Sequence, residues 1–167
     1  MQRLKAELKN RLKEATRIAV LGVGSELRGD DGAGIKVAQE LKESFKEHSG
    51  HSAVEVFLGG TAPENLTGAI KRFNPSHLII IDSADFRSRP GGMKILEPED
   101  IGGLSFSTHR MPIKMLAEYL CQSINCQVII IGLKPRSIDF GKSLSKEVAR
   151  SVKVLSTIIQ QIISNNK

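Results

Sequence analysis

Three continuous apolar runs set the strongest limit on the fold of this chain. They are residues 17–23 (RIAVLGV), 76–82 (SHLIIID) and 127–133 (QVIIIGL). An unbroken apolar run of strand length is typical of a strand that is buried on both faces, as in a parallel sheet covered by helices. We therefore expect a central sheet in which these three runs are buried strands.

Amphipathic segments alternate with the three runs. The spacing of apolar residues favours helices over 2–15, 34–46, 63–73, 109–122 and 143–164, and shorter strands over 54–58 and 92–96. No linker or low-complexity stretch divides the 167 residues, and this length suits one domain. The alternation predicts the α/β class, with a mostly parallel sheet and helices on both of its faces.

The net charge of +6 is concentrated near the N-terminus, where residues 1–18 carry six Lys and Arg against two Glu. With one Tyr and no Trp, the chain lacks a basic surface interleaved with stacking aromatics, so we expect no nucleic acid partner. The start MQRLKAELKN is too charged for a signal peptide, and no apolar run approaches the roughly 18 residues of a membrane span. We expect a cytoplasmic protein without a membrane span.

The two cysteines, Cys121 and Cys126, have the spacing C-x4-C. This spacing matches neither a zinc site nor a redox C-x-x-C motif. We favour two buried thiols. A local disulfide is the other interpretation, in keeping with the intracellular proteins of hyperthermophiles.

The predicted strands end at one edge of the sheet, and polar residues follow them there. Three segments should reach this edge: Gly22–Asp31, Asp82–Asp85 and the stretch that leads to His109. Open α/β sheets bind ligands in the crevice beyond the carboxyl ends of their strands. We therefore expect the functional site in this crevice.

The pair Gly22-x-Gly24 after a buried strand also begins a dinucleotide-binding pattern. The third glycine of that pattern would fall on Leu27, and the acid that ends its second strand would fall on Leu58. A phosphate-binding loop needs Gly-Lys-Ser/Thr, but residues 29–31 are GDD, and two carboxylates would repel a pyrophosphate. A nucleotide-binding regulator is therefore disfavoured.

Asp31, Asp82 and His109 are the strongest candidate ligands for a metal ion. Oxygen and nitrogen donors without a thiolate suit nickel, zinc or manganese, and three protein ligands leave positions open for a substrate or water. Each also has a structural interpretation: the acids at 30 and 31 as helix caps, Asp82 as a turn residue, and His109 as an ordinary helix-start residue. Of the first two acids, we expect Asp31 to be the ligand and Asp30 the cap.

Nucleophilic catalysis has no obvious candidate in the sequence. We find no Ser-His-Asp order and no G-x-S-x-G elbow, and neither cysteine lies on a predicted crevice loop.

Six stretches occur in order between about residues 18 and 155: VLGVGSELRGDDGAG (20–34), GGTAPENL (59–66), HLIIIDSAD (77–85), PG (90–91), STHRMPIKMLAEYL (107–120) and GLKP (132–135). Together they resemble the hydrogenase maturation endopeptidases, most of all the branch that processes the large subunit of hydrogenase 3. The first stretch and the STH-x-MP segment are the most specific. Two positions depart from the family pattern, with Ser25 in place of the usual asparagine and Leu58 in place of an aspartate.

The resemblance implies a single three-layer domain over residues 17–167 with a twisted five-stranded sheet, behind an N-terminal basic helical extension at 1–16. The extension has no family counterpart that we can identify; we interpret it as a packing element rather than a docking surface.

The resemblance also implies a function. Asp31, Asp82 and His109 would contact nickel and act in catalysis. The reaction would remove a C-terminal extension from the precursor of a nickel–iron hydrogenase large subunit after nickel insertion, and the substrate would supply the nickel. A non-catalytic metal-binding or chaperone module on the same fold is the alternative, because it would use the same ligands.

Overall fold

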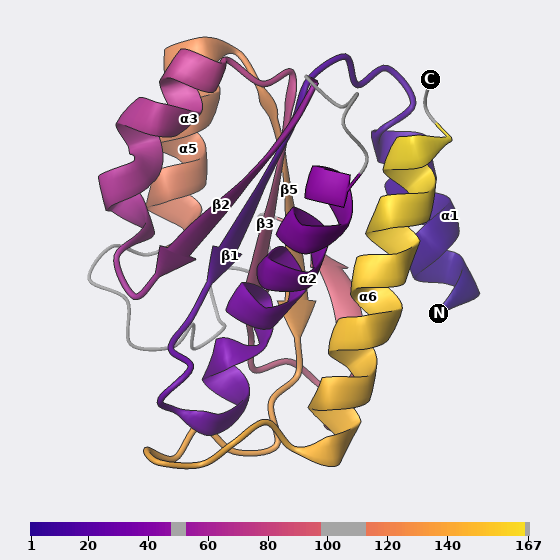
Figure 1. The fold of residues 1–167 in the computed structure, drawn as a ribbon, viewed down its shortest axis with the longest axis vertical. Coiled ribbons are helices and arrows are strands. Elements are labelled where there is room, and N and C mark those ends of the chain that lie inside the picture. Colours follow the sequence, from indigo (N-terminus) through magenta and orange to yellow (C-terminus); the bar gives the residue numbers. More distant parts are fainter. Residues whose placement is uncertain (48–52, 98–112, 166–167) are drawn as a thin grey trace.

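A five-stranded sheet forms the centre of the protein in its computed structural model, which describes residues 1–47, 53–97 and 113–165 (Figure 1). The strands are β1 (Ile18–Val23), β2 (Val54–Gly60), β3 (His77–Ser83), β4 (Met93–Leu96) and β5 (Gln127–Leu133). Their order across the sheet is β2-β1-β3-β5-β4. β1, β2, β3 and β5 are parallel, and β4 is antiparallel to β5. The three apolar runs are therefore the three inner strands.

Helices cover both faces of the sheet. The described helices are α1 (Gln2–Arg11), α2 (Ala33–Glu47), α3 (Thr67–Phe73), α5 (Ile113–Ile124) and α6 (Lys146–Ser164), with short 3-10 turns η1 (Gly29–Gly32) and η2 (Pro63–Leu66). Figure 1 shows α1, α2 and α6 on one face, and α3 and α5 on the other. The predicted three-layer α/β arrangement is confirmed.

The central strand β3 shows why the sheet needs both layers. All seven of its residues are buried. Because side chains alternate along a strand, Ile79 and Ile81 belong to the core beneath α2 and α6, whereas Leu78 and Ile80 belong to the core beneath α3 and α5. A continuous apolar run is thus what a strand between two helical layers requires.

The basic helix α1 contributes to the core despite its charge. Leu4, Leu8 and Leu12 are buried and belong to the same apolar cluster as the inner face of α6. Lys5 Nζ also donates a hydrogen bond of 2.8 Å to Gln161 Oε1 of α6. The charged side chains occupy the opposite face, as a four-residue spacing of leucines dictates.

Several element boundaries differ from those predicted. α1 ends at Arg11 rather than at residue 15, because the chain must turn before β1, and Ser76 Oγ accepts hydrogen bonds from Thr16 N and Arg17 N in that turn. The segment 63–73 begins as a 3-10 turn before it becomes helical. α6 begins at Lys146, with Ser145 as its N-cap. Residues 109–112 of the predicted fifth helix lie outside the described residues.

A close approach of α2 to the sheet positions the turn between β1 and α2. A Cβ atom on Gly34 would lie 2.2 Å from the carbonyl oxygen of Ile81 and 2.4 Å from that of Val23. Only glycine therefore lets the first turn of α2 rest on the ends of β1 and β3. None of the helices in the described ranges has the length and apolar character needed to cross a membrane.

Candidate active site

The strand order reverses at β1 and β3. The chain passes from β1 to β2 on one side and then crosses to β3 on the other, so the connections after β1 and β3 diverge. Such a switch point leaves a crevice beyond the carboxyl ends of the two strands. The turn 24–32 follows β1, and Asp82 lies at the end of β3. Asp31 and Asp82 are therefore brought to one place, as predicted.

Asp31 is fully buried, and both of its oxygens are hydrogen-bonded. Ser25 N donates to Oδ2 at 2.9 Å, and Ser83 Oγ donates to Oδ1 at 3.1 Å. The turn is tight: Gly24 has φ +124°, and a Cβ atom there would lie 1.8 Å from the carbonyl oxygen of Asp31. The contact of Ser25 comes from its backbone N–H, so the departure from asparagine at this position leaves it intact.

Ser83 joins the two acids. Its backbone N donates to Asp82 Oδ1 at 2.8 Å, while its hydroxyl donates to Asp31. Asp82 is also fully buried. A buried carboxylate is costly unless polar groups compensate it, and hydrogen bonds of this kind hold a carboxylate in a fixed orientation. Ser83 was not among the residues predicted from the sequence, although its position directly after an aspartate at a strand end is a signal that could have indicated it.

The third predicted ligand, His109, lies outside the described residues. Within residues 1–47, 53–97 and 113–165, no group of three His, Cys, Asp or Glu side chains is arranged to hold a metal ion. The set of Asp31, Asp82 and His109 stays a prediction, because His109 lies outside these ranges. The described part of the site is a pair of acids that Ser83 joins, with Ser25 N as a second donor to Asp31.

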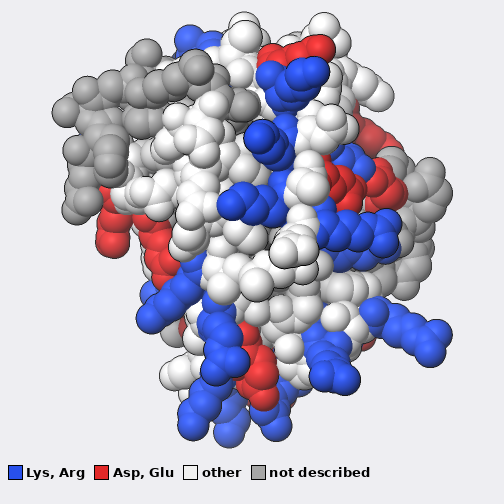
Figure 2. Space-filling model, turned by 90° about the vertical axis from the view of Figure 1, so that its right-hand side faces the viewer, with Lys and Arg blue, Asp and Glu red and all other residues white. Residues whose placement is uncertain are grey.

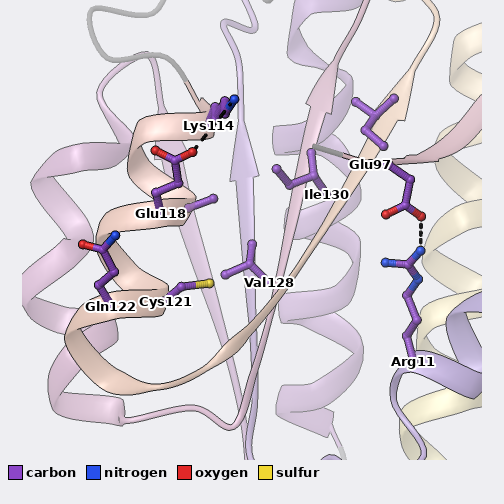
Figure 3. A pocket seen from close by; sticks show the side chains of 10 residues that line it. Arg11, Glu97, Lys114, Glu118, Cys121, Gln122, Val128 and Ile130 are labelled. Atoms are coloured by element: carbon purple, nitrogen blue, oxygen red, sulfur yellow. Dashed lines mark hydrogen bonds and ion pairs between the residues drawn. The ribbon is translucent and has the colours of Figure 1, made fainter. Parts of the chain in front are cut away.

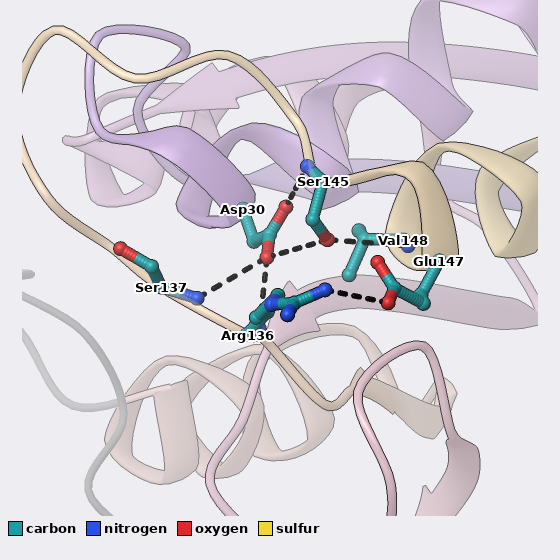
Figure 4. Close-up of polar contacts among 6 residues, drawn as sticks. All are labelled: Asp30, Arg136, Ser137, Ser145, Glu147 and Val148. Carbon is teal, nitrogen blue, oxygen red and sulfur yellow. Dashed lines mark hydrogen bonds and ion pairs between the residues drawn. The ribbon is translucent and has the colours of Figure 1, made fainter.

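Asp30 does not cap its own turn, so that prediction is wrong. The turn η1 has Arg28 as its N-cap and no side-chain cap hydrogen bond. Asp30 Oδ2 instead accepts from Arg136 N at 2.8 Å and Ser137 N at 3.3 Å. Ser145 donates to it twice, from N to Oδ1 at 2.6 Å and from Oγ to Oδ2 at 2.9 Å (Figure 4).

Asp30 thereby clamps the β5–α6 loop, residues 134–145, against the turn that carries Asp31. Two backbone hydrogen bonds reinforce the clamp: Gly29 N donates to the carbonyl of Lys142 and Asp30 N to that of Ser137, both at 3.0 Å. Ser145 is the N-cap of α6, and its hydroxyl accepts from Val148 N. Asp30 therefore supports the cap of a helix more than 100 residues away in sequence, which no local pattern could have shown.

A separate cavity of about 360 Å³ lies between α5 and the β4–β5 pair (Figure 3). Its apolar wall includes Val128 and Ile130, which precede the last three residues of β5 at the carboxyl edge. Arg11 forms an ion pair with Glu97 at its border. Because the cavity does not include Asp31 or Asp82, it is not part of the crevice.

The cysteines also lie away from the crevice. Cys121 lines the cavity just described, and Cys126 is buried directly before β5. Both are free thiols, so the interpretation as a disulfide is not supported. Burial is the main cause that raises the pKa of the Cys126 thiol to about 11, and electrostatic repulsion from Cys121 adds to it. Cys126 is therefore protonated at neutral pH and a poor nucleophile.

Solved structures share this fold. The crystal structure of the [NiFe] hydrogenase maturation protease HycI from Thermococcus kodakarensis KOD1 superposes with a TM-score of 0.84 at 28% identity, covering 95% of this chain and 99% of that one. This fold is thus that of a hydrogenase maturation endopeptidase of the α/β class.

The family model of the hydrogenase maturation proteases (HycI) matches residues 35–164. This chain belongs to the hydrogenase maturation protease family. A candidate hydrogenase maturation protease of Methanocaldococcus jannaschii is 36% identical over 163 residues, covering 95% of this chain and 96% of that protein. The hydrogenase 3 maturation protease of Escherichia coli K12 is 32% identical over 137 residues, covering 81% of this chain and 84% of that protein.

These comparisons confirm the resemblance inferred from the motifs. They also bear on the N-terminal helix: the alignment with the M. jannaschii protein covers 95% of this chain, so it includes part of residues 1–16.

Proposed function

We propose that this chain removes the C-terminal extension from the precursor of a nickel–iron hydrogenase large subunit once nickel has been inserted. Membership of the protease family supplies the reaction class. The observation that carries the proposal within the structure is the pairing of Asp31 and Asp82 through Ser83 at the switch point. Two oriented, buried carboxylates at the carboxyl edge of the sheet are suited to hold a cation or to accept a proton.

Nickel enters this proposal as part of the substrate. Asp31 and Asp82, together with His109, would complete the coordination of the nickel ion that the precursor already carries. The donor set of two carboxylates and an imidazole suits nickel, and the hydrogen bonds from Ser25 and Ser83 act as the outer shell that fixes ligating carboxylates. The requirement for nickel then selects nickel-loaded precursors, because a nickel-free precursor lacks the ion that these residues bind.

Hydrolysis of the peptide bond requires a polarised carbonyl and a water molecule that loses a proton. The nickel ion of the precursor supplies the first as a Lewis acid. With nickel held there, a carboxylate of the pair would take the proton from the water and pass it to the leaving amine, and the hydrogen bond from Ser83 keeps Asp31 in a fixed orientation for this step. The clamp formed by Asp30 keeps Asp31 in place while the precursor binds.

The deciding experiment is incubation of the chain with nickel-loaded and nickel-free precursor, followed by intact-mass measurement. We expect a shortened product from the loaded precursor only. Asp31→Asn and Asp82→Asn should abolish the product, whereas Asp139→Asn, an exposed aspartate on the β5–α6 loop, should not. Formation of a complex without any shortened product would instead indicate a non-catalytic metal-binding or chaperone module.

A further inference from the structure

Arg28, which immediately precedes η1, has an unusual environment. Its side chain is only partly exposed, and its Nε is buried without a hydrogen-bond acceptor. No ion pair to its guanidinium occurs among the residues that the structure describes. A buried donor without an acceptor is costly, and most such groups in proteins are satisfied. The turn that carries Asp31 therefore holds a cationic donor that lacks an acceptor within the described part of the chain.

Two large apolar side chains stand exposed beside Arg28. Leu27 is 65% exposed and Phe140 is 74% exposed. They come from different loops, which a hydrogen bond of 2.8 Å from Gly141 N to the carbonyl of Leu27 joins. Exposed aromatic and aliphatic side chains held on a rigid frame are typical anchors of protein interfaces. The frame here is the clamp of Asp30, which ties the same two loops together.

Basic residues surround this spot. Figure 2 shows Lys and Arg side chains gathered at the lower end of the molecule, the end at which the parallel strands terminate in Figure 1. At this end Glu26, Asp85 and Glu147 are paired with lysine or arginine. The basic residues of the carboxyl-edge loops for which the described structure shows no ion pair are Arg28, Arg87, Arg89 and Lys142.

We propose that Leu27, Arg28 and Phe140, which we call the rim, bind an acidic segment of the precursor next to Asp31. Leu27 and Phe140 contact an apolar side chain of that segment, and Arg28 receives one of its carboxylates. This inference rests on the proposed function for the identity of the partner. The rim would be a second recognition element, because it binds the polypeptide of the precursor whereas Asp31 and Asp82 bind the metal ion.

The chemistry of the rim selects this partner. The guanidinium of arginine matches a carboxylate with two parallel hydrogen bonds, and an excess of basic residues attracts an acidic segment over a longer range. A single-stranded nucleic acid would need several stacking aromatics along a basic groove. Phe140 is the only exposed aromatic side chain on the described carboxyl-edge loops 24–32, 84–92 and 134–145. A protein segment with one apolar anchor therefore fits better.

The test measures steady-state cleavage of the nickel-loaded precursor by Arg28→Ala and Phe140→Ala. We expect KM to rise about 10-fold or more for Arg28→Ala and about 5-fold for Phe140→Ala, with kcat within twofold of the parent. Arg28→Lys keeps the positive charge but cannot donate two parallel hydrogen bonds to a carboxylate, so its KM should lie between those of the parent and Arg28→Ala. Lys9→Ala, which removes an exposed charge from α1, is the matched control and should leave KM unchanged.

A precursor whose acidic residues next to the cleaved bond are changed to Asn or Gln supplies the partner side of the test. It should raise KM for the parent chain but add nothing for Arg28→Ala. An unchanged KM for both rim variants and for this precursor overturns the inference while leaving the proposed function intact.

Binding measured by surface plasmon resonance with the same loaded precursor separates the other case. The precursor could bind to the parent chain and more weakly to Arg28→Ala, with no cleavage by either. That result would contradict the proposed function and support the rim as a binding site. If a single-stranded RNA binds more tightly than the precursor, and Arg28→Ala removes that binding, the rim is a nucleic-acid-binding site. The proposal that it binds the precursor is then wrong.

Discussion

Replacing Asp30 with alanine removes the acceptor of four hydrogen bonds that join two loops at the carboxyl edge. Three of the donors are backbone N–H groups, those of Arg136, Ser137 and Ser145, and the fourth is the hydroxyl of Ser145. Asp30 is 1% exposed, so its carboxylate is shielded from solvent in the folded protein. The substitution therefore removes the acceptor of four part-buried donors in a segment that also caps α6.

The size of the effect follows from these bonds. A hydrogen bond to a charged group contributes about 1.5–3 kcal/mol. The bond from Ser137 N is long at 3.3 Å, and the four are not additive because they share one carboxylate. We expect Asp30→Ala to lower the free energy of unfolding by about 3–5 kcal/mol, among the largest effects of single substitutions. For a domain of this size the melting temperature should fall by about 10–15 °C.

Urea unfolding followed by far-UV circular dichroism measures this change, because the chain has no tryptophan for a fluorescence assay. Asp30→Asn keeps one acceptor oxygen and should lose about half as much. Asp139→Ala is the control: Asp139 lies on the same loop and accepts from Ser137 Oγ at 2.6 Å, but it is exposed. We expect its effect to stay within about 0.5 kcal/mol. Asp30→Ala within about 1 kcal/mol of the parent would refute the idea that this carboxylate clamps the two loops.

Three further predictions concern packing and titration. Gly34→Ala should lower the free energy of unfolding by about 1–3 kcal/mol or more in urea unfolding, because the added Cβ would meet two strand carbonyls. Gly68→Ala in α3 is the control. It should be neutral or slightly stabilising, because the added Cβ meets only the end of a flexible arginine at 3.6 Å. Burial lowers the pKa of His77 below 6.5, so the unfolded chain binds the proton more tightly and stability should fall as pH drops below about 6.5. The difference in free energy of unfolding between the parent and His77→Gln, measured from pH 8 to pH 5, should become smaller on acidification. A constant difference would contradict the lowered pKa of His77. Because burial and Cys121 raise the pKa of Cys126 to about 11, iodoacetamide at pH 7.5 should alkylate Cys121 first, and mass mapping that finds Cys126 modified first would contradict this.

The strand pattern and the meeting of two acids follow from the amino-acid sequence alone. The apolar runs are long enough to demand burial on both faces, and the alternation with helices dictates a parallel sheet. Parallel strands end at one edge, so Asp31 and Asp82 had to come together there. These conclusions depend only on local periodicity and chain direction, which are properties of the sequence itself.

The partners of each polar group were decided by tertiary structure. Asp30 is adjacent in sequence to a helix start, where capping is its usual role, yet its acceptor atoms serve donors 106 to 115 residues away. Ser83 became visible as the link between the acids only when β1 and β3 were placed side by side. The loops that carry Leu27 and Phe140 are likewise joined only through folding. Periodicity reports which side of an element faces the core, but a hydrogen bond depends on where a distant loop returns, and only the packed sheet determines that.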